Sequence, residues 1–82
     1  MQIRVKLFAL MREKAGTDTI ALEVPAGANL SQAIAALVRH YPMLEPYMAN
    51  TRCSLHMDFV GPETSLAEGD ELALIPPVSG GV

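Results

Sequence analysis

The segment PPVSGGV, residues 76–82, has the composition of a chain end that reacts inside another protein. Gly80 and Gly81 have no side chains, so this stretch can pass through a slot that would exclude any Cβ. The two prolines favour an extended backbone where the segment begins. The residues from Pro77 to Gly81 then span roughly 15 Å at ~3.3 Å each. The chemistry available here is that of a glycine carboxylate. The alternative is a glycine-rich end without a role.

The other side chains that could do chemistry do not form a recognisable site. Cys53 is the single cysteine and has no evident neighbouring base, so we expect a small hydrophobic residue in a strand. His40 and His56 are too far apart to suggest a metal-ligand pattern, so we expect no metal site. The acidic residues are interpreted as solvated turn or strand-edge positions, not as a catalytic pair: Asp18, Asp58, Asp70 and Glu71.

Composition limits the classes of protein to which the chain can belong. Its 82 residues make one domain, and 50% of them are hydrophobic, which supports a core and argues against disorder. The net charge of −3 argues against nucleic-acid binding, because phosphates attract clustered Lys and Arg. No apolar run approaches the ~20 residues that cross a bilayer. The opening MQIR begins alternating sequence, so we expect no signal peptide and a cytoplasmic protein.

Three segments alternate between apolar and polar residues, as half-buried strands do: residues 3–10, 18–24 and 71–76. Pro76 ends the last of them, because it cannot donate to a strand ladder. The sequence MREKAG, between the first two, is too long for a tight hairpin turn. It accommodates a single helical turn that ends at Gly16.

Residues 29–41 carry the strongest helix signal. Asn29 is a good N-cap, and Gln32 follows three residues later in the position of a capping box. Pro42 then stops the helix. The apolar residues between them recur at helical spacing and predict one buried face: Leu30, Ala33, Ile34, Leu37, Val38 and Tyr41.

The remaining segments are less regular. PMLEPYMAN, residues 42–50, is interpreted as an irregular connector with room for one helical turn. CSLHMDFV, residues 53–60, is strand-like, and two short strands joined by a poor turn over residues 56–58 are one interpretation. GPETSLAEGD is rich in turn residues. We expect three methionines to fill gaps in the core: Met43, Met48 and Met57.

The element order β-β-α-β-β predicts a two-layer α+β domain, in which a helix crosses one face of a mixed sheet. This order and the small size favour a β-grasp, ubiquitin-like arrangement, although other small α+β folds share the order. We divide the chain into a domain over residues 1–75 and an extended C-terminal tail over residues 76–82.

The end GDELALIPPVSGG resembles the ends of the small subunits of molybdopterin synthase, which are sulfur carriers with a β-grasp fold. The opening VKLFALMREKAG resembles their first strand and loop. The resemblance covers most of the chain and is weakest between Tyr41 and Met57. A bare Gly-Gly end is unspecific, whereas the string IPPVSGG after a strand is a specific motif.

The resemblance implies a mechanism and partners. In that family an adenylating enzyme uses ATP and Mg²⁺ to convert the terminal glycine carboxylate, a poor electrophile while ionised, into an acyl-adenylate. Sulfur then replaces the activated oxygen to give a thiocarboxylate. The tail enters the large subunit of the synthase, where the sulfur passes to a pterin precursor. By this resemblance Gly81 is the reacting position and Gly80 gives slender access. The chain itself binds no cofactor, and its partners supply the catalytic side chains.

Val82 departs from the family pattern, in which the second glycine is the terminus. It places the Gly81 carbonyl in a peptide bond, so either Val82 is removed, or it is not native, or the chain is a divergent carrier. A second departure is SLHMDFV, residues 54–60, because members of the family often have an asparagine-containing hairpin there and this chain has His56 near the position of that asparagine. Two alternatives stay open. One is a ubiquitin-like modifier or interaction module joined to proteins through Gly81. The other is a sulfur carrier for thiamine or tRNA thiolation.

Alternation also predicts a docking surface. Phe8 and Ile75 both fall on outward faces, where a large apolar side chain is more informative than one in the core. If the first and last strands are neighbours, as in a β-grasp, the two residues form one apolar patch near the tail. By resemblance Phe59 joins them. We expect this patch to dock on both the adenylating enzyme and the synthase large subunit. The alternative is a Phe8 ring covered by the chain's own loops.

Overall fold

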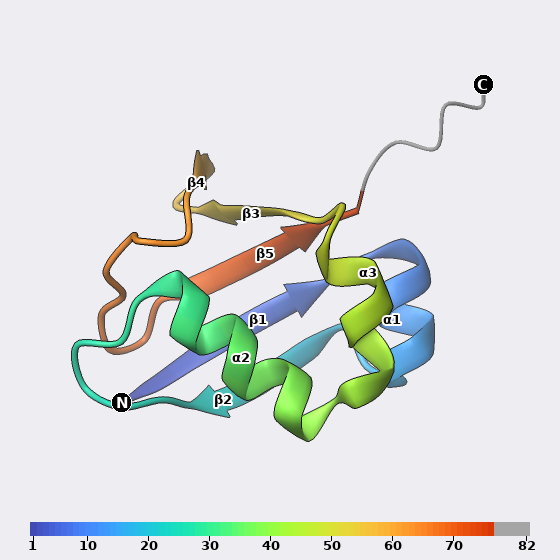
Figure 1. Ribbon diagram of the computed structural model, residues 1–82, viewed down its shortest axis with the longest axis horizontal. Helices are drawn as coiled ribbons and strands as arrows, with labels where there is room; N and C mark the ends of the chain where they lie inside the picture. Colours follow the sequence, from blue (N-terminus) through green and yellow to red (C-terminus); the bar gives the residue numbers. More distant parts are fainter. Residues whose placement is uncertain (77–82) are drawn as a thin grey trace.

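The computed structural model of the protein describes residues 1–76 (Figure 1). The sequence-based expectations for Gly80, Gly81 and Val82 therefore concern residues outside the described part. The described chain forms a two-layer domain in which one long helix crosses a single sheet. None of the helices in residues 1–76 has the length and hydrophobicity that a membrane-spanning helix needs.

The elements follow the order β1 (Gln2–Leu7), α1 (Ala9–Ala15), β2 (Thr19–Glu23), α2 (Leu30–His40), the 3₁₀ helix η1 (Pro42–Leu44), α3 (Glu45–Met48), β3 (Arg52–Leu55), β4 (Asp58–Val60) and β5 (Glu71–Ile75). The five strands lie in the order β2-β1-β5-β3-β4. β1 and β5 form a parallel pair at the centre, and the other neighbouring pairs are antiparallel. The predicted mixed sheet, with its first and last strands as neighbours, is confirmed.

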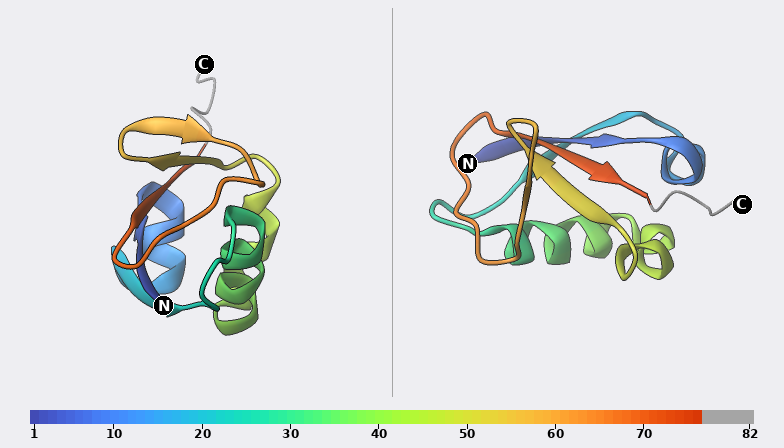
Figure 2. Two further views of the ribbon diagram at one scale, coloured as in Figure 1. Left: turned by 90° about the vertical axis from the view of Figure 1, so that its left-hand side faces the viewer. Right: turned by 90° about the horizontal axis from the view of Figure 1, so that it is seen from above.

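The core lies between the sheet and α2. In β1 the inward residues Ile3, Val5 and Leu7 are each 1% exposed, as the alternation predicts. α2 lies across the same face of the sheet (Figure 2). It packs Leu30, Ala33 and Leu37 against the inward strand residues, as the apolar periodicity predicts, and leaves its polar side in solvent. The predicted face differs in detail, because Ala36 is also buried while the other three predicted residues are only partly buried: Ile34, Val38 and Tyr41.

The start of α2 is held by the predicted capping box. The Asn29 side-chain oxygen accepts a hydrogen bond from the Gln32 backbone N–H at 2.9 Å, and the Gln32 side-chain oxygen accepts one from the Asn29 backbone N–H at 2.9 Å. The Leu30 N–H donates to the Thr64 carbonyl at 2.9 Å. Donors that a helix start leaves free are thus satisfied, and the loop after β4 is tied to α2.

The first strand is shorter than predicted, because it ends at Leu7 and α1 follows. Phe8 keeps an extended backbone, but the chain turns at Ala9, whose φ is 52°. α1 spans seven residues instead of a single turn and ends, as predicted, at Gly16, whose φ of 77° suits glycine. Within α1, Met11 is fully buried. This long-range burial, which local sequence does not reveal, stabilises the longer helix.

The connector and the hairpin also differ in detail from the prediction. Residues 42–50 are more regular than an irregular connector, since η1 and α3 follow one another and Leu44 anchors them in the core. Residues 52–60 form two strands, which confirms the two-strand interpretation. The turn between the strands is formed by His56 and Met57, with φ values of 53° and 70°.

The prediction that three methionines fill the core is wrong for two of them. Met57 is 95% exposed because it occupies the hairpin turn, and Met43 is 45% exposed on η1. Met48 is partly buried and packs against the core cluster. The fully buried methionine is Met11, which reaches the core from α1. Composition shows that apolar side chains are available for a core, but the path of the chain decides which methionines are buried in it.

Candidate functional site

The candidate site is the face of the sheet opposite α2, which no element of residues 1–76 covers (Figure 2). Residues paired in register point to the same side of a sheet and so form rows across the strands. One outward row contains Lys6, Ala73, Ser54 and Phe59, from β1, β5, β3 and β4. The alternation that buries the inward residues therefore also sets the composition of this open face.

The next row on the same face lies where β5 ends and the tail begins. Arg52 pairs with Ile75. Phe8 directly follows Leu7, which pairs with Leu74, so Phe8 and Ile75 start from neighbouring positions on the two strands. We call Phe8, Ile75, Arg52 and Phe59 the tail-end patch.

The structure brings together the three residues that the sequence predicted as a patch. Phe8 is 40% exposed and Phe59 is 60% exposed, while Ile75 is partly buried between them. Phe8 and Phe59 are three strands apart, or roughly 14 Å at ~4.8 Å per strand. Ile75 and Arg52 lie on β5 and β3, the two strands between them. The alternative, a Phe8 ring covered by the chain's own loops, does not hold within residues 1–76.

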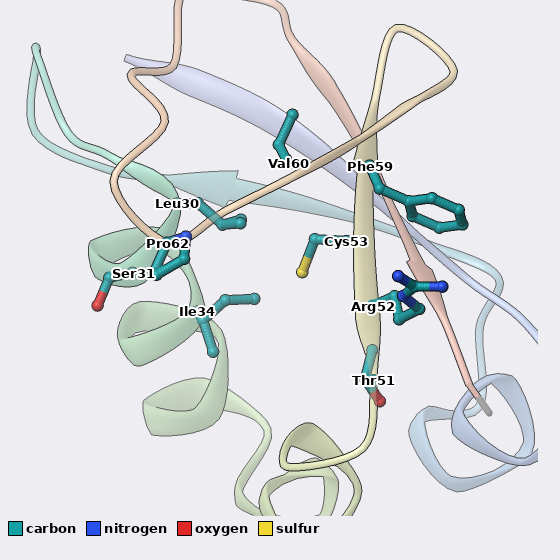
Figure 3. Close-up of a pocket in the computed structure, with 9 residues that line it drawn as sticks. All are labelled: Leu30, Ser31, Ile34, Thr51, Arg52, Cys53, Phe59, Val60 and Pro62. Carbon is teal, nitrogen blue, oxygen red and sulfur yellow. The ribbon is translucent and has the colours of Figure 1, made fainter.

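Arg52 is the member of this patch that the sequence reasoning missed. The carbon at the centre of its guanidinium lies 4.5 Å from the centroid of the Phe59 ring. The two side chains lie next to each other on β3 and β4 (Figure 3). A cation–π contact at an exposed site contributes about 0.5–1 kcal/mol. The predicted strand began at Cys53, and extending its alternation backwards by one residue would have placed Arg52 on the outward face with Ser54.

Charges are unevenly distributed over the open face. The two rows nearest the tail carry the cations Lys6 and Arg52 and no carboxylate. Within residues 1–76 neither cation is in an ion pair. At the far end of the face, Arg4 lies opposite Glu71 in the register. A protein with a net charge of −3 therefore has a locally cationic surface beside its tail.

Cys53 lies on the other side of β3 from this patch. Its sulfur points into a cavity of about 470 Å³ between the β3–β4 hairpin and the start of α2 (Figure 3). Burial raises the pKa of the Cys53 thiol. The thiol is therefore protonated at neutral pH and is a poor nucleophile. Its partly buried packing against the core agrees with the small hydrophobic residue that we expected.

The other titratable residues do not converge on a site. His40 is exposed in the last turn of α2, where positive charge suits the helix dipole. His56 is exposed at the hairpin turn, and its Nε2 lies 3.5 Å from an Asp70 side-chain oxygen. Within residues 1–76 no three or more His, Cys, Asp or Glu side chains are arranged to hold a metal ion.

A second apolar hollow lies close to the start of the tail. It has a volume of about 450 Å³, lies between α1 and α3, and is lined in part by Leu10, Tyr47 and Pro76. Leu10 is 45% exposed there. Apolar surface thus borders the beginning of the tail on two sides, in this hollow and in the tail-end patch.

Two similar proteins have names that describe different activities. The molybdopterin synthase sulfur carrier subunit of Chlamydomonas reinhardtii is 37% identical, in an alignment that covers 99% of this chain and all of the relative. The small archaeal modifier protein 1 of Haloferax volcanii is 40% identical, with 93% of this chain and 97% of the relative covered. Both are therefore similar to this chain over nearly their whole length.

Solved structures confirm the β-grasp fold. The crystal structure of SAMP1 from Haloferax volcanii has a TM-score of 0.91 at 34% identity and covers 99% of this chain and all of that one. Subunit 1 or 2 in a complex of the molybdopterin-converting factor from Helicobacter pylori has a TM-score of 0.73 at 21% identity, with coverage of 99% and 100%, and shares the fold. The ThiS family model matches residues 5–81. The motif IPPVSGG, the β-grasp sheet and this match lead to one conclusion: the chain belongs to the ThiS family.

Proposed function

We propose that this protein is the sulfur-carrying small subunit of a molybdopterin synthase. The observation that carries the proposal is the string IPPVSGG, which begins with Ile75, the last residue of the central strand β5 of a β-grasp domain. A relative that matches over its full length is named a molybdopterin synthase sulfur carrier subunit. A sulfur carrier for thiamine or tRNA thiolation has no such support in the names of the relatives described above.

In the proposed reaction Gly81 is the only residue of this chain whose atoms change. An adenylating partner uses ATP and Mg²⁺ to join the Gly81 carboxylate to AMP, with release of pyrophosphate. This activation is needed because an ionised carboxylate is a poor electrophile. Sulfur at the oxidation level of hydrosulfide then attacks the Gly81 carbonyl carbon, and AMP departs with the activated oxygen, which leaves a Gly81 thiocarboxylate. That sulfur passes to the pterin precursor in the synthase large subunit. Gly80 adds no side chain that would obstruct the approach.

The tail-end patch is the proposed docking surface for both partners. Exposed aromatic rings are the side chains most often responsible for binding energy in protein interfaces. Phe8, Ile75 and Phe59 lie on the face of the sheet beside the point at which the tail begins. A partner that covers this patch receives the tail within the ~15 Å that Pro77 to Gly81 can span.

The decisive experiment is a reconstituted synthase. The chain ending at Gly81 is converted to the thiocarboxylate, verified by the mass increase for one oxygen replaced by sulfur, and mixed with a synthase large subunit and the pterin precursor. We expect molybdopterin to form in proportion to the carrier added, and none from the carboxylate form. If the thiocarboxylate is made but no molybdopterin forms while an authentic carrier works in parallel, the proposal is wrong.

A second candidate function is a ubiquitin-like protein modifier. It is favoured by the 40% identity to the small archaeal modifier protein 1 of Haloferax volcanii. In that case the activated Gly81 would form an amide bond with a lysine of another protein. Covalent adducts that appear in cells with the chain ending at Gly81, and disappear when Gly81 is deleted, would support this function. The two functions share the activation step and differ only in the final nucleophile.

A further inference from the structure

We infer that Arg52 is a specificity residue of the tail-end patch, and that its guanidinium binds a carboxylate on the synthase large subunit beside the apolar site that receives Ile75 and Phe59. This inference deepens the proposed function and rests on it. The inferred surface of the large subunit is therefore apolar, with a carboxylate opposite Arg52. The following four observations lead to it.

Arg52 lies next to the surface that the synthase large subunit is proposed to cover. Arg52 pairs in register with Ile75, the last residue of β5, and is exposed on the open face. The tail begins one residue later. A protein that takes up the tail and covers Ile75 must therefore cover or closely approach the guanidinium of Arg52.

The contact with Phe59 prepares Arg52 for binding. With its guanidinium 4.5 Å from the ring centroid, the side chain is held against the sheet. An extended Arg side chain loses rotamer entropy when an interface orders it, and a stacked one has already lost part of it. The planar guanidinium can stack on the ring and still donate to a carboxylate from its edge. Lysine would keep the charge but lose this geometry.

The electrostatics of this end of the sheet require an acidic partner group. Neither Arg52 nor Lys6 has a carboxylate partner within residues 1–76. A cation that is covered by a partner without an opposite charge loses hydration and gains nothing in return. A basic partner surface would in addition be repelled. A complex that covers Arg52 is thus stable only where the partner supplies an acceptor, and a carboxylate is the strongest one available in proteins.

The same face contains a matched control. Arg4 is exposed on β1 and has the same side chain, but it lies at the far end of the face opposite Glu71 in the register. Substituting Arg4 or Arg52 by glutamine changes the net charge of the protein equally. Only Arg52 borders the tail, so a specific contact and a general charge effect give different results.

The experiment measures the Kd of the complex with the synthase large subunit encoded by the same genome, at about 0.05 and 0.5 M salt. The carriers are the wild type, Arg52→Gln, Arg52→Glu, Arg52→Lys and Arg4→Gln, each ending at Gly81. We expect Arg52→Gln to weaken binding about 10-fold or more at low salt and to lose most of the salt dependence. Arg52→Glu should bind more weakly still, because it repels the partner carboxylate. Arg52→Lys should keep the salt dependence at reduced affinity.

Arg4→Gln should stay within about 2-fold of the wild type, since an exposed charge away from the contact is screened. The Arg52→Glu variant separates a direct charge contact from a purely structural role: displacement of the Phe59 ring alone would weaken both Arg52→Gln and Arg52→Glu equally. Equal affinities for those two variants, or equal losses for Arg52→Gln and Arg4→Gln, would overturn the inference while leaving the proposed function intact. A wild-type carrier that does not bind the large subunit at all would overturn the proposed function as well.

Discussion

Phe8 is a large apolar residue that stays exposed at the end of β1. Its ring is 40% exposed, although it directly follows a strand whose inward residues are almost fully buried. It also flanks α1 as the N-cap residue without a side-chain hydrogen bond. The Phe8 side chain therefore makes no capping hydrogen bond at the start of α1, and its exposed position agrees with the proposed docking.

We predict that Phe8→Ala weakens binding of the synthase large subunit by about 1–3 kcal/mol, because a buried aromatic anchor is lost from the interface. The free energy of unfolding should change little. Calorimetric titration measures the first quantity and denaturant unfolding the second. Met43→Ala is the matched control, since Met43 is 45% exposed but lies on η1, in the helix layer. Unchanged affinity of the Phe8 variant, or a large loss of its stability, would contradict the prediction.

Val82 is the residue at which the printed sequence and the proposed chemistry disagree. A carboxylate at Val82 lies about 3.5 Å further along the chain than one at Gly81. It is also flanked by a β-branched side chain that is stiff at χ1. Both features misplace the carboxylate in a pocket shaped for a terminal glycine, where an error of ~1 Å costs about 100-fold in rate.

We therefore predict that the 82-residue form is inactive as a substrate of the adenylating enzyme and that the 81-residue form is active. ATP–pyrophosphate exchange with the cognate enzyme measures this step directly. The thermal unfolding of the two forms should coincide, since the last residue of the buried core cluster within residues 1–76 is Leu74. Equal exchange by both forms would show that Gly81 is not the required terminus. Exchange by neither form would contradict both functions that require activation of Gly81 and would favour a module that binds other proteins without being joined to them.

At the scale of elements, the β3–β4 hairpin contains two of the three non-glycine residues with positive φ within residues 1–76; the third is Ala9. Leu55 pairs with Asp58, so the loop between the strands has only His56 and Met57, both with positive φ. Such two-residue loops favour Asn-Gly, because both positions are left-handed and glycine alone has no Cβ penalty. The sequence signal for this turn was weak since neither residue is typical of it.

We predict that Met57→Gly raises the free energy of unfolding by about 1 kcal/mol, since a left-handed conformation costs an L-residue roughly that much. The Met57 side chain is 95% exposed, so its loss removes no core contact. Met57→Ala is the control that removes the side chain and keeps the Cβ, and it should be close to neutral. Urea unfolding measures all three proteins. A destabilised glycine variant would show that the Met57 side chain has packing that its exposure does not reveal.

At the scale of the whole molecule, folding and reactivity are assigned to different parts of the chain. Within residues 1–76 the buried core cluster is drawn from residues between Ile3 and Leu74, and the residues proposed to react or to give access, Gly81 and Gly80, come later in the sequence. Substitutions in the two parts should then have separable effects. We expect substitutions in the domain to change stability and substitutions in the tail to change sulfur transfer.

We predict that Gly80→Ala and Gly81→Ala leave the melting temperature unchanged and reduce sulfur transfer steeply. The added methyl group must fit a channel shaped for none, and small displacements of a reacting group are costly. Single-turnover transfer from the thiocarboxylate form to the large subunit measures the effect. Normal transfer by both alanine variants would remove the hypothesis that the glycines are needed for passage.

The sequence by itself predicted the features that depend on residues close together in the chain. Alternation predicted the inward and outward residues of β1 and β5, and the Asn29–Gln32 pair predicted the start of α2. Both succeed because a strand or a capped helix start depends on residues only a few positions apart. The motif IPPVSGG identified the family for the same reason, as an uninterrupted string next to a strand.

Only the tertiary structure decided the features that depend on distant contacts. Met11 is buried from within α1, which is longer than the single turn predicted, and the exposure of Met57 follows from its place in a turn. The contact between Arg52 and Phe59 requires that β3 and β4 pair in one particular register. Arg52 and Phe59 meet because the packing of the whole core brings their two strands together. The sequence pattern of a single strand does not show which other strand will pair with it.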